Sequence, residues 1–75
     1  MVWIAMSESE LVFVVEEAPE GGFTARCLNA PIFTEADTLE AVPAQVRDAV
    51  RCHFEEDERP SVIRLHYIRE EIIAA

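Results

Sequence analysis

Carboxylates are the most numerous side chains of this protein that could do chemistry. They gather in three short runs, at residues 16–17, 55–58 and 70–71. A catalytic carboxylate pair needs one member in an apolar or like-charged environment that shifts its pKa. These runs fall at the ends of the expected elements, where carboxylates are normally solvated. We therefore expect no catalytic residue among them and no enzymatic activity.

Metal ligands and nucleophiles are few. The cysteines are Cys27 and Cys52 and the histidines are His53 and His66, without the short paired spacing of a zinc site. Adjacent side chains on a helix diverge by about 100°, so Cys52 and His53 cannot both face one ion. Cys27 is expected to be a small core residue. The glycine-rich phosphate motifs and the nucleophile elbow are missing too, so the sequence predicts no metal and no cofactor.

The charge balance excludes one class of partner. Fifteen Asp and Glu stand against six Arg and no Lys, for a formal net charge of −9 at pH 7. Such a chain repels phosphate backbones, so direct nucleic-acid binding is not expected. A small basic protein would be attracted to it. The alternative, that the acidity serves solubility alone, stays open at this point.

The length of the chain and its number of cysteines limit how it can be organised. Its 75 residues predict one domain over residues 1–75, with an N-terminal extension at 1–8 and a C-terminal tail at 70–75. Two cysteines are too few for a disulfide framework, and the apolar start lacks the features of a signal peptide. No stretch approaches the ~20 apolar residues of a membrane span. A cytoplasmic protein without membrane contact is expected.

Strand patterns fill the first half. Residues 10–17 are rich in β-branched and aromatic side chains and apolar on both faces, which predicts a strand covered on both sides. Turn residues occupy 18–22, and residues 23–28 alternate apolar and polar, so the two runs predict a hairpin. A short third strand is expected at 32–35.

A helix and a last strand fill the second half. The helix is expected to start at Asp37 or Thr38, with Glu40 completing a capping-box spacing, or to be regular only from Pro43 onward. The acidic run at 55–58 is unfavourable at the C-terminal, negative end of the helix dipole, and Pro60 is expected to stop the helix. Residues 61–69 are predicted to form a strand. The predicted buried stripe of the helix is Leu39, Val42, Val46, Ala49, Val50, His53 and Phe54.

The expected fold class is therefore α+β, a small antiparallel sheet with one helix on one face, in the order β-β-β-α-β. The uncovered face carries too many aliphatic side chains for a freely solvated surface, which predicts a partner site or a homo-oligomer, dimer or higher. The residues expected on that face are Val12, Val14, Thr24, Arg26, Val62, Arg64, His66 and Ile68.

A second interpretation of the same face concerns its positively charged side chains. Arg26, Arg64 and His66, together with Thr24, have the chemistry to bind an anion. The chain would then be a stand-alone small-ligand or accessory domain. Mixed arginine and aliphatic composition is also typical of protein interfaces, which favours the interaction reading.

Two segments resemble the HicB family of antitoxins. They are residues 15–26, containing Gly22-Phe23-Thr24-Ala25, and residues 32–40, containing Asp37-Thr38-Leu39-Glu40. The likeness extends over about residues 10–69. It implies a partial RNase H-like fold without the RNase H active site. It also implies a non-enzymatic module that binds and neutralises a small basic RNA-cleaving toxin of the HicA type.

The sequence departs from the HicB pattern in two ways. A C-terminal DNA-binding module, usual in these antitoxins, does not follow the last predicted strand. The connector after the second strand is altered at residues 28–32. The resemblance is thus to a short, stand-alone HicB-like domain, and DNA binding is not expected of it.

Overall fold

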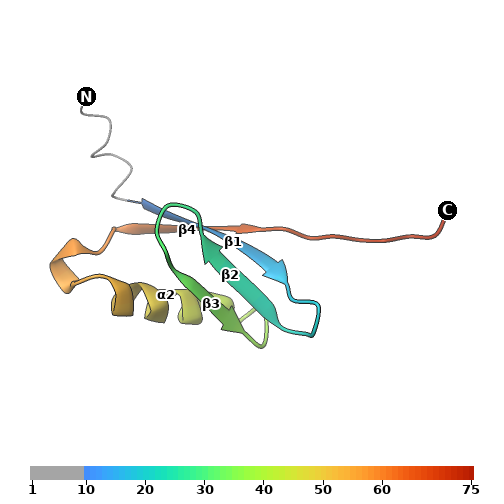
Figure 1. The fold of residues 1–75 in the computed structure, drawn as a ribbon, viewed down its shortest axis with the longest axis horizontal. Coiled ribbons are helices and arrows are strands. Elements are labelled where there is room, and N and C mark those ends of the chain that lie inside the picture. Colours follow the sequence, from blue (N-terminus) through green and yellow to red (C-terminus); the bar gives the residue numbers. More distant parts are fainter. Residues whose placement is uncertain (1–9) are drawn as a thin grey trace, which may run out of the picture.

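The computed structural model describes residues 10–75, so the extension expected at 1–8 lies outside the described residues. Three strands, a helix, a short 3-10 turn and a last strand follow one another (Figure 1). This order confirms the predicted α+β fold. The elements are β1 (Glu10–Glu17), β2 (Phe23–Cys27), β3 (Phe33–Ala36), α2 (Val42–His53), η1 (Glu56–Glu58) and β4 (Val62–Tyr67).

The sheet has the order β3-β2-β1-β4. β1 pairs antiparallel with β2, and β2 with β3, but β4 pairs parallel with β1. The expectation of a purely antiparallel sheet was therefore wrong, and the sheet is mixed. The cause is the crossover: α2 returns the chain to the end of the sheet where β1 begins, so β4 runs in the same direction as β1.

The hairpin between β1 and β2 confirms its prediction. Ala18 N–H donates to Gly22 O at 2.9 Å, and Gly21 N–H donates to Ala18 O at 3.0 Å. Both glycines have positive φ, 107° and 78°, which L-residues adopt only with strain. The turn fixes the register that places Val14 beside Arg26.

The helix begins later than its cap pattern indicated. α2 starts at Val42 with Pro43 in its first turn, where a missing N–H costs little, and no side chain caps it. Thr38 instead accepts the Ala41 N–H on Oγ1, within a turn that precedes the helix. The start at Asp37 or Thr38 was therefore wrong, and the alternative of a helix regular from Pro43 was correct.

The helix ends at His53, before the acidic run, so the expectation that Pro60 stops it was wrong. Phe54 N–H donates to Val50 O at 3.0 Å and closes α2. The acidic residues Glu56–Glu58 form the separate turn η1.

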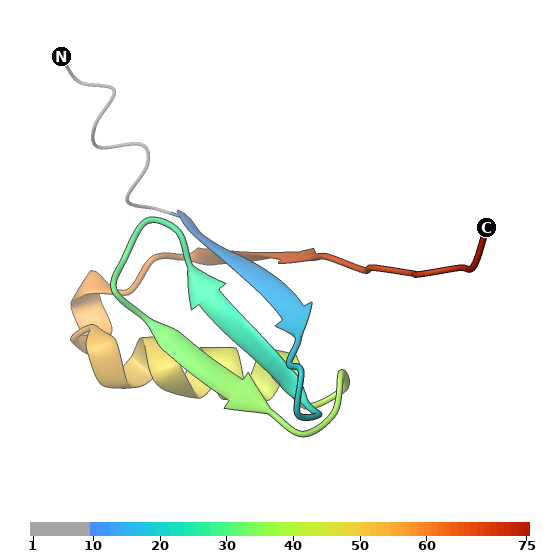
Figure 2. The ribbon, with the colours of Figure 1, turned by 45° about the vertical axis from the view of Figure 1, so that its right-hand side comes forward.

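The core lies between α2 and one face of the sheet. α2 packs over β3 and β2, while β4 lies at the margin of the sheet (Figure 2), and the inward side chains of β1 are buried. From the helix the stripe buries Val42, Val46 and Val50, whereas Leu39 and His53 of the predicted stripe are exposed. The sheet and its loops contribute Leu11, Phe13, Val15, Ala25, Cys27 and Ile32.

After Tyr67 the chain leaves the sheet. Residues 68–75 continue the line of β4 as an extended segment that projects away from the rest of the molecule (Figures 1 and 2). We call this segment the C-terminal arm.

Candidate functional site

The candidate site is the face of the sheet opposite α2, which we call the open face. Side chains alternate along β1: Leu11, Phe13 and Val15 are buried toward the helix, while Val12 and Val14 point the other way. No described element covers Val12 and Val14, and their neighbours on the sheet leave them half-buried. Within residues 10–75, the expectation that β1 is covered on both faces was therefore wrong.

The strand register brings the eight predicted residues onto this one face. The pairing sets Val14 beside Arg26 on one side and beside His66 on the other, and sets Val12 beside Arg64. Val62 is 47% exposed and Ile68, just past the end of β4, is 54% exposed. The complete predicted set on the open face is Val12, Val14, Thr24, Arg26, Val62, Arg64, His66 and Ile68.

Sequence reasoning missed four residues of the open face. Phe33 pairs with Arg26 and is 58% exposed, which makes it a large unprotected aromatic group on this surface. Glu35 pairs with Thr24, and Glu10 and Glu16 alternate with the valines of β1. The period-two alternation along β1 and β3 could have placed these four residues on the open face. For β3, this also requires knowledge of its register with β2.

One ion pair spans the edge of the open face. Arg64 Nε donates to Glu10 Oε2 at 2.5 Å. This hydrogen bond is the main reason that the pKa of Glu10 lies below its usual value, and the charges of Arg64 and His66 lower it further. The same hydrogen bond raises the pKa of Arg64. Both groups are solvent-exposed, so the pair orders the surface more than it stabilises the fold.

A loop asparagine fixes the start of β1. Asn29 Oδ1 accepts the Val12 N–H at 3.1 Å, and Asn29 Nδ2 donates to Glu10 O at 2.9 Å. The side-chain amide thus replaces a strand partner at the point where β2 ends. Cys27 Sγ lies 3.3 Å from the same oxygen, and its burial confirms the predicted core role of this cysteine.

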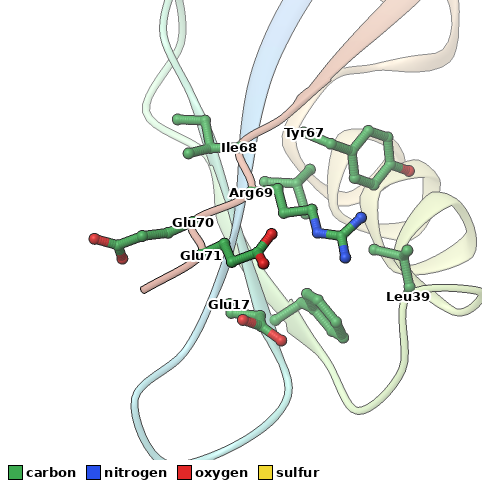
Figure 3. Close-up of a pocket in the computed structure, with 9 residues that line it drawn as sticks. Glu17, Leu39, Tyr67, Ile68, Arg69, Glu70 and Glu71 are labelled. Atoms are coloured by element: carbon green, nitrogen blue, oxygen red, sulfur yellow. The ribbon is translucent and has the colours of Figure 1, made fainter. Parts of the chain in front are cut away.

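Two grooves flank β4 on the helix side of the sheet. The first, about 540 Å³, has an apolar floor of Val15, Phe23, Leu39 and Tyr67 and a charged rim (Figure 3). In Figure 3, Arg69 lies on the same side of the chain as Tyr67, and Glu70 lies on the opposite side. The second groove, about 370 Å³, is lined by Pro43, Val46, Arg47, Pro60, Ser61, Ile63 and Leu65.

The structure brings no metal ligands together in the part it describes. Among residues 10–75, no three His, Cys, Asp or Glu side chains are placed to hold an ion. Cys27 is buried while Cys52 is exposed on α2. The His53 ring packs edge-on against Phe54, with centroids 4.7 Å apart.

No helix within residues 10–75 has the length and apolar content needed to cross a membrane.

Known proteins resemble this chain at the level of sequence. A UPF0150 protein of Archaeoglobus fulgidus is 52% identical over 52 residues, which are 69% of this chain and 77% of that protein. A UPF0150 protein of Thermotoga maritima is 32% identical over 68 residues, covering 91% of this chain and 96% of its own length. No family model matches the sequence, and no solved structure matches it. The extent of the second match, which covers nearly all of both chains, shows that this chain belongs to the UPF0150 family.

Proposed function

We propose that this chain is a non-enzymatic protein-binding module that acts as a HicB-like antitoxin does. Its open face would bind a small basic protein, and the candidate partner is an RNA-cleaving toxin of the HicA type. The observation that carries the proposal is the open face itself. It combines half-buried valines and exposed aliphatic and aromatic groups with a few charged groups, on a sheet whose other face holds the core.

Charge supports a basic partner. The chain carries a formal net charge of −9 at pH 7. Glu10, Glu16 and Glu35 lie on the face itself, and the guanidinium of Arg64 is already paired with Glu10. Encounter with a cationic surface is therefore favoured over long range, while the valines supply the short-range contact area.

The anion-binding alternative has less support from the geometry. Arg26 and His66 lie two strands apart with Val14 between them, so their Cα atoms are roughly 10 Å apart. An anion bound between them would rest on an apolar side chain. The third cation, Arg64, already donates to Glu10, so the charge of its guanidinium is partly offset.

Co-expression with a HicA-type toxin tests the proposal. The chain is expected to restore growth of cells that make the toxin, and Val14→Arg is expected to abolish this rescue because it places bulk and positive charge at the centre of the open face. Leu39→Arg, an equal charge change at an exposed residue on the helix side, is the matched control and should still rescue. Loss of rescue in both variants, or in neither, would contradict a binding site on the open face.

The complex should also be sensitive to salt. Attraction between separated surface charges is screened over about 8 Å at physiological ionic strength. Association of the purified proteins should therefore slow as salt is raised, and a rate independent of salt would remove the electrostatic part of the proposal.

A further inference from the structure

The β4 edge of the sheet has unused backbone hydrogen-bonding groups. Ile68 N–H donates to Val15 O at 2.9 Å, which shows that this residue turns its backbone toward β1. Successive peptide groups along a strand point in opposite directions, so Ile63, Leu65 and Tyr67 turn theirs outward. β4 is the outermost strand on this side of the sheet, and no described element pairs with that edge.

This edge also lacks the usual protection. Natural edge strands are commonly short, carry lysine or proline, or are covered by a loop. β3, at the opposite edge, has only four residues. β4 has six residues without an internal proline, and the arm extends the same line by eight more. A long, straight strand edge of this kind is a template for another strand.

The arm carries apolar side chains that nothing in the described chain covers. Ile72 is 87% exposed and Ile73 is 77% exposed. They are adjacent in an extended segment, so they point to opposite sides. Within the described chain both side chains stay largely in water, which has an unfavourable free energy for each exposed isoleucine.

We propose that a second copy of this chain pairs antiparallel along the β4 edge, with the arm of each copy lying against β4 of the other. The twofold axis passes beside Tyr67, so the Tyr67 residues of the two copies oppose each other. This pairing joins the two sheets into one continuous sheet across the dimer. It uses the outward backbone groups of both copies, as an antiparallel ladder requires.

The register follows from charge. An axis at Tyr67 sets Arg64 of each copy opposite Glu70 of the other, on the open face. Each dimer then contains two such pairs, and the Arg64 side chain is 56% exposed, which leaves it room for a second carboxylate beside Glu10. An axis at Arg69 would oppose two guanidinium groups. An axis at Ile68 would set Glu70 against His66, a weaker partner than an arginine that is always charged.

In the same register, Ile72 and Ile73 both lie against the surface of the partner copy. Ile72 of one copy lies opposite the exposed Val62 of the other on the open face. Ile73 lies opposite Ser61, beside the groove that Pro43, Val46 and Ile63 help to line. The two apolar groups of the arm thus cover apolar surface on both sides of the partner's edge.

This contact differs from the self-association expected from the sequence, which placed Val12 and Val14 in the dimer interface. Pairing at the edge leaves these two valines accessible. The inference does not rest on the proposed function, because a dimer forms here without a basic partner.

A pair of charge-reversal variants tests the register. The full-length chain is expected to be a dimer by light scattering across a concentration series. Arg64→Glu and Glu70→Arg should each weaken dimerisation about tenfold, because each replaces two attractive pairs by two repulsive ones. An equimolar mixture of the two variants should restore dimers, since every pair in the mixed dimer is again attractive.

Glu71→Arg is the matched control. It makes the same charge change one residue further along the arm, opposite Ile63 rather than Arg64. Mixed with Arg64→Glu, it should fail to restore dimers, and circular dichroism should show that all variants are folded. A monomeric wild-type chain, single variants that dimerise normally, or equal restoration by Glu71→Arg would each overturn the proposal.

Discussion

Phe13 and Val14 are neighbours in β1 but lie on opposite faces of the sheet. Phe13 is fully buried beneath α2, and Val14 is only half-buried on the open face. The strand offers similar apolar side chains to both faces, but a 75-residue chain has one helix in its described part with which to cover them. The comparison shows that the apolar content of β1 exceeds what residues 10–75 bury, and the surplus is where we place a partner.

The largest effect should separate the two faces directly. Phe13→Ala removes a fully buried ring and is expected to lower the free energy of unfolding by about 3–5 kcal/mol. Phe33→Ala removes the same ring from the open face and should lower it by no more than about 1 kcal/mol. Urea denaturation at one fixed protein concentration measures both. Similar losses would mean that the open face is as tightly packed as the core.

The second largest effect is expected at Asn29, whose side chain binds the backbone at the start of β1. Asn29→Ala leaves the Val12 N–H and the Glu10 carbonyl without their side-chain partner and should cost about 1–3 kcal/mol. Asn29→Asp keeps an acceptor for Val12 but loses the donor to Glu10, so its cost should be smaller. Hydrogen exchange of the Val12 amide is the more specific readout. It should accelerate in the alanine variant and much less in the aspartate variant.

A smaller effect is expected at the turn that sets the register of both faces. A Cβ at Gly22 would lie 2.9 Å from the Ala36 carbonyl oxygen at a φ of +78°, so Gly22→Ala should cost about 1–2 kcal/mol or more. Gly21→Ala meets no atom within 4 Å and carries only the strain of its positive φ. Thermal unfolding should rank Gly22→Ala as the more damaging change. The reverse order would indicate that the turn relaxes freely.

The smallest effect lies on the open face and is seen in titration. Arg64→Ala removes the main cause of the lowered Glu10 pKa, which should rise toward its usual value of 4.5. Because the folded pKa is lowered, the contact contributes stability above the usual pKa and loses it as pH falls through the lowered one. NMR titration of the Glu10 carboxyl measures the change. Arg26→Ala, on a different strand, should leave it unaltered.

The sequence predicted most of the elements because their signals are local. The alternation in residues 23–28, the glycine turn and the valine stripe of the helix each lie within a few residues of one another, and the structure confirms them. The parallel pairing of β4 with β1 was missed because it joins residues about fifty positions apart, where no local pattern indicates direction. Of the two predicted helix starts, the one at Pro43 was correct and the one at Asp37 or Thr38 was wrong, because Pro43 outweighed the spacing of Asp37 and Glu40.

The residues of the candidate site were predicted in the same uneven way. The eight open-face residues followed from period-two alternation, which fixes the face of each residue once the strand is known. Phe33 was missed because its face depends on the β2–β3 register. The sequence predicted only a C-terminal tail at 70–75, and no local pattern indicates that residues 68–75 continue the line of β4, on which the proposed arm contact depends.

Methyl NMR of the labelled chain, titrated with a catalytically inactive HicA-type protein, tests the central claim most directly. If the open face binds the partner, the methyl signals of Val12, Val14 and Val62 should shift or broaden. Those of Leu11, Val15 and Val46, in the core between the sheet and α2, should stay in place. Changes confined to α2 and the helix side, or no change in any methyl signal at saturating partner, would contradict the account.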